Sequence, residues 1–332
     1  MILSYWLRLA SLCFAAFFLI HAAAGVVAWF AERPAIRLSE RVRARSAARL
    51  LFWLRVLPAA IAVAFVAGVC APSYLRFEEN PAGEKVGLLC LGFAFLGALV
   101  WAVSLLRGLR TLVHSARFTR VCRRTGSSVR LTGKPSEMLV IQSARPVLVQ
   151  SGILRPYIVI SRGLLSDFSS GELEAALGHE SAHWASRDNW KRLLLAFLPE
   201  ILPVGRGFDA LERGWSKFTE RAADDSVSAQ GAGPALSLAA ALVRLARMRA
   251  TVGPPLWVPR SVSSLAGSDD LPGRIERLLA PVSPVAAPVR SFRYARRVLL
   301  GFGGVVLAAT LALLASPALL SSVHEVLEHL LR

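Results

Sequence analysis

Cysteine and histidine are both scarce in this chain of 332 residues, which holds four cysteines and six histidines. The cysteines form no C-x-x-C pair, so the sequence predicts neither a disulfide framework nor a cysteine metal site. Three of them lie in long apolar runs, where we interpret them as small packing residues. They are Cys13, Cys70 and Cys90, and the fourth is Cys122.

Acidic residues are also scarce, with 22 Asp and Glu against 39 Lys and Arg, a formal net charge of +17. Such a charge is compatible with nucleic-acid binding, so the positions of the charges matter more than their sum. The basic residues gather beside apolar runs, and residues 107–134 hold eight of them with no acid. Basic residues commonly flank membrane spans, and this explains the pattern. We therefore predict no direct nucleic-acid binding.

Four apolar runs contain no Lys, Arg, Asp or Glu at all, and 54% of the residues are hydrophobic. Each run has about 20 residues, the length that a helix needs to cross a bilayer. We therefore predict four transmembrane helices and a lipid bilayer as partner. The runs are residues 9–31, 56–75, 86–106 and 298–318.

The sign of the net charge alternates between the successive segments that connect these runs. Residues 31–55 contain seven arginines and two glutamates, whereas residues 76–85 contain three glutamates, one arginine and one lysine. By the positive-inside rule, both termini are extracytoplasmic and residues 107–297 are cytoplasmic. We thus predict a membrane domain over residues 1–113, a cytoplasmic domain over 114–289, and a fourth span with a short extracytoplasmic tail over 290–332.

The cytoplasmic region begins with short runs rich in Val, Ile and Leu, which predict strands of a small sheet. Ser169 stands three residues before Glu172, a capping-box spacing that predicts the start of a helix over about 170–197. Residues 253–289, rich in Pro, Ser and Ala, are interpreted as a loose connection with one short helix at 273–280. The fold class is α+β, mainly helical. The other predicted strands are 127–131, 137–142, 146–150 and 156–160, and the other helices are 213–230 and 235–250.

The stretch "LGHESAHW" places His179 and His183 four residues apart. On a helix their side chains lie about 40° from each other, so both imidazoles can hold one ion. Glu180 then points to the place where a metal would activate water, and it can accept the proton as general base. The alternative is two histidines that only pack on a helix, next to a solvated glutamate.

A third ligand is needed, and no histidine stands at the later positions where a metzincin has one. A carboxylate is therefore expected, as in His2Glu zinc sites. Glu200, Glu212 and Glu220 all follow at plausible distances. Glu220 is preferred because Asp224, one turn later, can accept the spare N–H of a ligating histidine. Asp188 is either a similar support or a polar residue paired with Arg187.

The stretch "GILRPYIVISRGLLSDFSSGELEAALGHESAHWASRD", followed by "TERAADDSV", resembles the BlaR/MecR-type membrane zinc metallopeptidases, family fifty-six in the usual metallopeptidase numbering. Ala223 departs from it, because many members have Cys there. The resemblance implies a zincin-like (gluzincin) domain that binds Zn²⁺ in the inner membrane of a bacterium. It implies His179, His183 and Glu220 as zinc ligands, Glu180 as base, and Asp188 and Asp224 as supporting groups. We expect no C-terminal penicillin-binding sensor domain of the kind that the best-known members carry.

The main hypothesis is thus a membrane-bound zinc endopeptidase that cleaves a cytoplasmic protein, which the resemblance suggests is a transcriptional repressor or another signalling protein. The strand "PYIVI" could hold an extended substrate by edge pairing. One alternative keeps the chemistry, since "ERAAD" also fits quality-control peptidases similar to HtpX and the CAAX prenyl proteases. Another is a catalytically silent membrane scaffold in a signalling complex.

Overall fold

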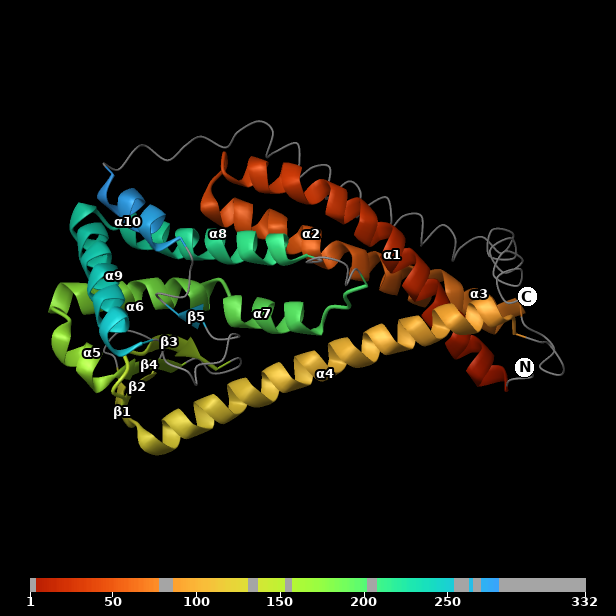
Figure 1. The fold of residues 1–332 in the computed structure, drawn as a ribbon, viewed down its shortest axis with the longest axis horizontal. Coiled ribbons are helices and arrows are strands. Elements are labelled where there is room, and N and C mark those ends of the chain that lie inside the picture. The colour runs from red at the N-terminus through yellow and green to blue at the C-terminus, as the bar shows by residue number, and fades with distance from the viewer. Residues whose placement is uncertain are drawn as a thin grey trace.

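Three long helices meet at one end of the molecule, and one of them extends to a small sheet, covered by shorter helices, at the other end (Figure 1). This computed structural model describes residues 4–77, 86–130, 137–152, 157–201, 208–253, 263–264 and 270–280. The predicted fourth span, residues 298–318, lies outside the described residues, as does most of the segment between the second and third spans.

The long helices are α1 (Tyr5–Ser39), α2 (Ala44–Phe65) and α4 (Leu88–Thr125). A π-helical turn, η1 (Val66–Cys70), continues α2 into α3 (Ala71–Phe77). Among the described residues, three helical segments are long and apolar enough to cross a membrane: Tyr5–Ser39, Ala44–Phe77 and Leu88–Thr125. They contain the first two predicted spans and all of the third except residues 86 and 87. Large apolar side chains on these helices point outward, as a lipid-facing surface requires; they include Val27, Leu89 and Phe95.

The sheet has five strands in the order β1-β2-β4-β3-β5. Only β2 and β4 run parallel to each other. Because β4 lies between β2 and β3, it has no free edge, and the expectation that "PYIVI" holds a substrate by edge pairing is wrong. The outer edge of β3 pairs with β5 through Val149 and Gln150. The strands are β1 (Ser127–Arg130), β2 (Glu137–Ile141), β3 (Leu148–Ser151), β4 (Tyr157–Ser161) and β5 (Ser263–Ser264).

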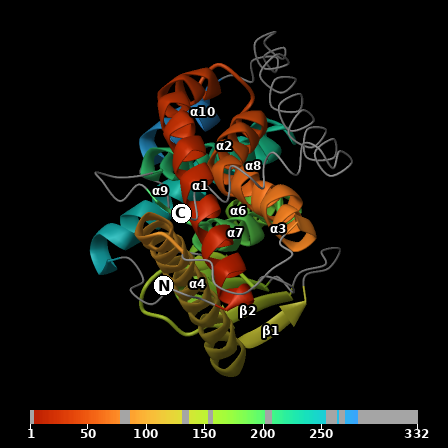
Figure 2. The same cartoon turned by 90° about the vertical axis from the view of Figure 1, so that its right-hand side faces the viewer.

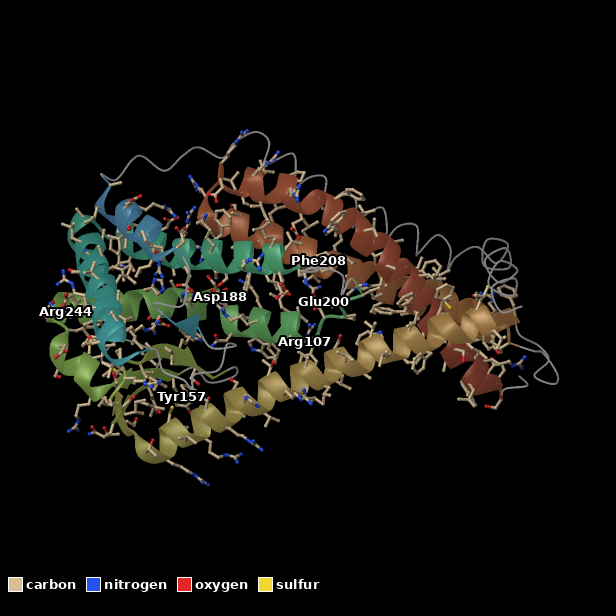
Figure 3. The ribbon with its side chains drawn as sticks, in the orientation of Figure 1. Arg107, Tyr157, Asp188, Glu200, Phe208 and Arg244 are labelled. Carbon is tan, nitrogen blue, oxygen red and sulfur yellow. The ribbon has the colours of Figure 1, made fainter. Side chains whose placement is uncertain are left out.

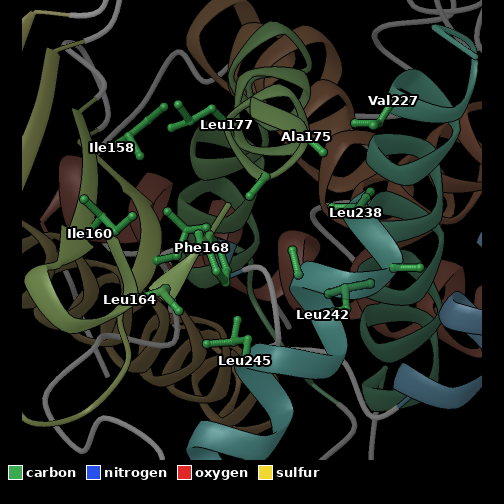
Figure 4. Close-up of a cluster of buried hydrophobic side chains, with 14 of the residues drawn as sticks. Ile158, Ile160, Leu164, Phe168, Ala175, Leu177, Val227, Leu238, Leu242 and Leu245 are labelled. Atoms are coloured by element: carbon green, nitrogen blue, oxygen red, sulfur yellow. The ribbon is translucent and has the colours of Figure 1, made fainter. Parts of the chain in front are cut away.

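Side chains of β4 alternate between two cores, as the twofold period of a strand dictates. Ile158 and Ile160 pack into one cluster with α6 and α9 (Figure 4). Tyr157 and Val159 pack on the other face with Phe118, from the last turns of α4. The sheet is therefore covered on both faces, and the end of a candidate membrane helix forms one of the two covers.

Six shorter helices complete the described fold. The capping box at the start of α6 is confirmed: the Glu172 N–H donates to Ser169 Oγ (3.3 Å), and the Ser169 N–H donates to the Glu172 carboxylate (2.8 Å). The helices are α5 (Arg162–Asp167), α6 (Ser170–Ala185), α7 (Asp188–Phe197), α8 (Asp209–Ser228), α9 (Ala232–Val252) and α10 (Leu271–Leu279).

The prediction of a single helix over residues 170–197 is wrong. The chain breaks between α6 and α7, where Arg187 adopts a left-handed conformation with φ of 55°. A left-handed residue other than glycine is unfavourable, so the surrounding contacts must hold it. No proline or glycine marks this break in the sequence, which is why the helical pattern did not reveal it.

Helix α8 lies alongside α2, as Figures 1 and 2 both show. Leu211, Trp215 and Phe218 of α8 share one apolar core with Leu51 and Phe52 of α2. The opposite side of α8 faces α6. The helix is thus fixed between a candidate membrane helix and the helix that carries the histidine motif.

Candidate metal centre

Three buried side chains meet between α6 and α8: His179, His183 and Glu220, whose potential ligand atoms all lie within 4.8 Å of one another. The Nε2 atoms of the two histidines are 3.1 Å apart. Glu220 places Oε2 3.4 Å from His179 Nε2 and Oε1 3.6 Å from His183 Nε2. Ligands at about 2.0–2.1 Å from a tetrahedral zinc are about 3.3 Å apart, so the spacing and the N2O donor set both fit zinc.

Glu180 lies beside this cluster and is fully buried. Neither of its carboxylate oxygens has a hydrogen-bond partner among the described residues. Burial raises the pKa of Glu180 to about 7, although His183 and His179 lower it in part. The carboxyl group is therefore held near the range in which a general base works at neutral pH.

The break at Arg187 places Asp188 against the second histidine. Asp188 Oδ2 lies 2.9 Å from His183 Nδ1, and Lys191 donates to Oδ1 at 2.9 Å. On an unbroken helix these residues, five apart, would lie about 140° from each other. The left-handed turn brings Asp188 to a position from which it can orient the His183 ring. The sequence left open whether Asp188 supports a histidine or pairs with Arg187, and the structure shows the contact with His183.

Asp224 lies in the corresponding place beside the first histidine, as a close ion-pair contact. Its Oδ1 lies 3.0 Å from His179 Nδ1, one turn after Glu220 on α8. Each imidazole therefore has a carboxylate at Nδ1 and directs Nε2 toward Glu220. A carboxylate at one ring nitrogen selects the tautomer whose other nitrogen is free to bind a metal.

The other candidate ligands lie elsewhere. Glu200 accepts from Arg107 Nη1 at 2.7 Å, at the end of α7 (Figure 3). Glu212 accepts from Arg55 Nε at 3.1 Å, and Arg55 is only 1% exposed. Glu212 is thus a partly exposed carboxylate that pairs with a buried arginine of α2.

Sequence reasoning missed Arg274, which lies on α10 and is 1% exposed. It donates to Asp224 through Nε and Nη2, both at 2.7 Å, and its Nη1 lies 3.2 Å from Glu220 Oε2. The sequence predicts a short helix over 273–280 within a loose connection, and α10 confirms the helix, but no role in the site was expected for it. One signal was available: Arg274 stands one turn before Leu278, on the apolar face of the short helix, and a buried arginine needs a carboxylate partner.

Without a metal, the cluster binds additional protons. Burial alone would lower the pKa of His183, but Glu220 and Asp188 outweigh it and raise the pKa to about 10. Asp224 and Glu220 likewise raise the pKa of His179 against the effect of burial. A cation that binds there must displace these protons, because only a neutral imidazole can be a ligand.

Comparison with known proteins identifies the region that carries these residues. Residues 116–249 match the model of peptidase family M48. A protease HtpX homologue from Archaeoglobus fulgidus is 34% identical over 74 residues, which are 22% of this chain and 22% of that protein. The chain thus aligns with about a fifth of the length of this relative. No solved structure matches the chain.

Residues 116–249 are therefore similar to the peptidases of family M48, and the chain also has candidate membrane helices. Peptidases of family M48 use zinc, in agreement with the His-His-Glu cluster. Neither comparison points to the BlaR/MecR type in particular.

Proposed function

We propose that this protein is a membrane-embedded zinc endopeptidase in which His179, His183 and Glu220 hold the ion and Glu180 is the general base. The observation that carries the proposal is the cluster of two histidine nitrogens and a carboxylate, spaced 3.1–3.6 Å apart and fully enclosed. The match of this region to family M48 supports it.

When bound, zinc would supply Lewis-acid chemistry, lowering the pKa of a water molecule and polarising the peptide carbonyl. Two carboxylates next to the histidine rings orient the ligands for that role. Asp188 and Asp224 hold the two rings at Nδ1, so that both Nε2 atoms point to one place. Glu180 accepts the proton of the attacking water on a carboxylate oxygen and can then deliver it to the leaving amine.

We propose that the substrates are membrane proteins or protein segments close to the bilayer. Helix α8, which carries Glu220, packs directly on the candidate membrane helix α2, and α4 covers one face of the sheet. This packing supports a site that lies close to the bilayer. Together with the HtpX relative, this favours quality control over cleavage of one transcriptional repressor. In this proposal the peptidase region is on the cytoplasmic side of a bacterial inner membrane.

Metal content tests the proposed chemistry first. The detergent-purified wild type should bind about one zinc per chain, as expected for a His2Glu site. Glu220→Ala should lose that zinc. Asp225→Ala is the matched control, because it removes an exposed carboxylate of the same helix that pairs with Arg277. A folded wild-type protein that takes up no zinc would leave the scaffold as the better description.

The substrate class requires a second experiment. Membrane proteins and cleaved peptides from cells with the wild type would be compared with those from cells with Glu180→Gln. Cleavage of many misfolded membrane proteins supports quality control, whereas cleavage of a single repressor supports signalling. A deletion phenotype that Glu180→Gln does not share would instead indicate a scaffold.

A further inference from the structure

Arg274 is the deepest positive charge next to the metal centre, and it comes from outside the region that family M48 matches. That region ends at residue 249, whereas Arg274 belongs to α10, Leu271–Leu279. With 1% exposure, its guanidinium is removed from water. A buried charge of this kind is maintained only where carboxylates compensate it with good geometry.

The geometry joins Arg274 to both carboxylates of α8. Nε and Nη2 hold the two oxygens of Asp224 at 2.7 Å each, a two-point contact that fixes the plane of the carboxylate. Asp224 Oδ1, one of these oxygens, also lies 3.0 Å from His179 Nδ1. The orientation of Asp224, and through it the ring of His179, is thus set by the arginine.

The third contact reaches a proposed ligand directly. Arg274 Nη1 lies 3.2 Å from Glu220 Oε2, the same oxygen that is 3.4 Å from His179 Nε2. One rigid guanidinium therefore connects the two acids of α8: it holds Asp224 by two hydrogen bonds and forms an ion pair with Glu220. A lysine could not do this, because its ammonium is a single point charge on a flexible stem.

We propose that Arg274 is a positioning residue of the metal centre: through its own contacts with Asp224 and Glu220, its guanidinium group increases the affinity of the site for zinc. This inference rests on the proposed function. It assigns to the segment after α9 a part in building the site, in addition to connecting the peptidase region to the rest of the chain.

Other contacts hold α10 without touching the site. Leu278 is buried in the core that α9 and the sheet share. Arg277 donates to Asp225 at 2.6 Å in an exposed pair, one turn from the buried one. The Arg277 pair joins the same two helices, α10 and α8, so its removal separates loss of helix docking from loss of positioning.

The test is zinc affinity, measured by competition with a chromogenic chelator on the full-length protein in detergent. The variants are Arg274→Gln, Arg274→Lys and the control Arg277→Gln, each with a thermal melt of the zinc-free form. We expect zinc binding to weaken by ~10- to 100-fold in Arg274→Gln, the usual effect of removing a group that orients a ligand. Arg274→Lys should weaken binding less, and Arg277→Gln should bind as the wild type does.

Each outcome decides the inference. If the two Arg274 variants melt at lower temperature but bind zinc as tightly as the wild type, Arg274 is merely structural and the inference is wrong. Equal weakening in Arg277→Gln would also overturn it, since docking alone would then explain the effect. If Arg274→Gln does not fold, Arg274→Lys decides in the same way. A wild type that binds no zinc is a different result, because it refutes the proposed function and the inference together.

Discussion

Replacing Glu180 by Gln should abolish peptidase activity while leaving the zinc site intact. The amide has the shape of the carboxyl group but cannot accept a proton, so the rate should fall by ~10²- to 10⁴-fold, the usual contribution of a general base. Glu180 makes no hydrogen bond with the described residues that the substitution would break. It is also not one of the three clustered ligands.

The same substitution should stabilise the zinc-free protein, and the size of the effect follows from the pKa. Burial raises the pKa of Glu180 from 4.5 to about 7, so the folded chain holds this proton more tightly than the unfolded chain. The contribution of Glu180 to stability is therefore most favourable below about pH 4.5, and it decreases as the pH rises toward 7. At about 1.4 kcal/mol per pH unit, ionised Glu180 costs the zinc-free protein about 3 kcal/mol.

Three measurements check this reasoning: cleavage of an unfolded protein such as casein, zinc content, and thermal melts of the zinc-free forms at pH 4.5 and pH 8. Glu180→Gln should melt several degrees above the wild type at pH 8, with a much smaller difference at pH 4.5. Zinc should reduce the difference at pH 8, because a cation compensates the buried carboxylate. Wild-type cleavage rates in the variant would refute the mechanism, and identical melts at pH 8 would refute the account of its burial.

Further outcomes follow from other parts of the structure. Asp188→Ala should weaken zinc binding by ~10- to 100-fold in a chelator competition, because His183 loses the carboxylate at Nδ1. Glu172→Ala should destabilise the protein by about 1 kcal/mol at neutral pH, because it removes half of the capping box. Hydrogen bonds to the Ser169 N–H and to Arg244 lower the Glu172 pKa against the effect of burial, so this loss should diminish in melts below about pH 4.5. A cysteine at Glu79 should react with an impermeant thiol reagent from outside the cell and one at Arg43 should not; the reverse result would overturn the proposed orientation.

Periodicity and capping predicted much of this fold. Strands β1 to β4 lie where short Val- and Ile-rich runs were found, and α6 begins at the capping box of Ser169. These features are local, so neighbouring residues suffice to specify them. The order of the strands is not local, and the placement of β4 in the interior of the sheet was missed for that reason.

The candidate site also has one part that local sequence patterns predict and another that they do not. His179 and His183 were recognised because one helix face carries both, and Glu220 was preferred over Glu200 and Glu212 because Asp224 follows it by one turn. Arg274 could not be placed by such reasoning, since its partners are 50 residues away in the chain at Asp224 and further still at Glu220. Its burial is a consequence of tertiary packing, which short-range patterns do not encode.

Helix α7 shows how the site and the candidate membrane helices are physically joined. Its first residue, Asp188, holds His183 at 2.9 Å. At its other end, Arg107 of α4 donates to the backbone oxygens of Ala196 and Leu198, at 3.0 and 2.6 Å. These oxygens belong to the last turn of the helix, where carbonyls have no intrahelical partner and a cation is favourable. A ten-residue helix spans about 15 Å, so one short rigid element connects α4 to a proposed zinc ligand. The break at Arg187 makes the contact between Asp188 and His183 possible, because on an unbroken helix these two side chains would lie about 140° apart.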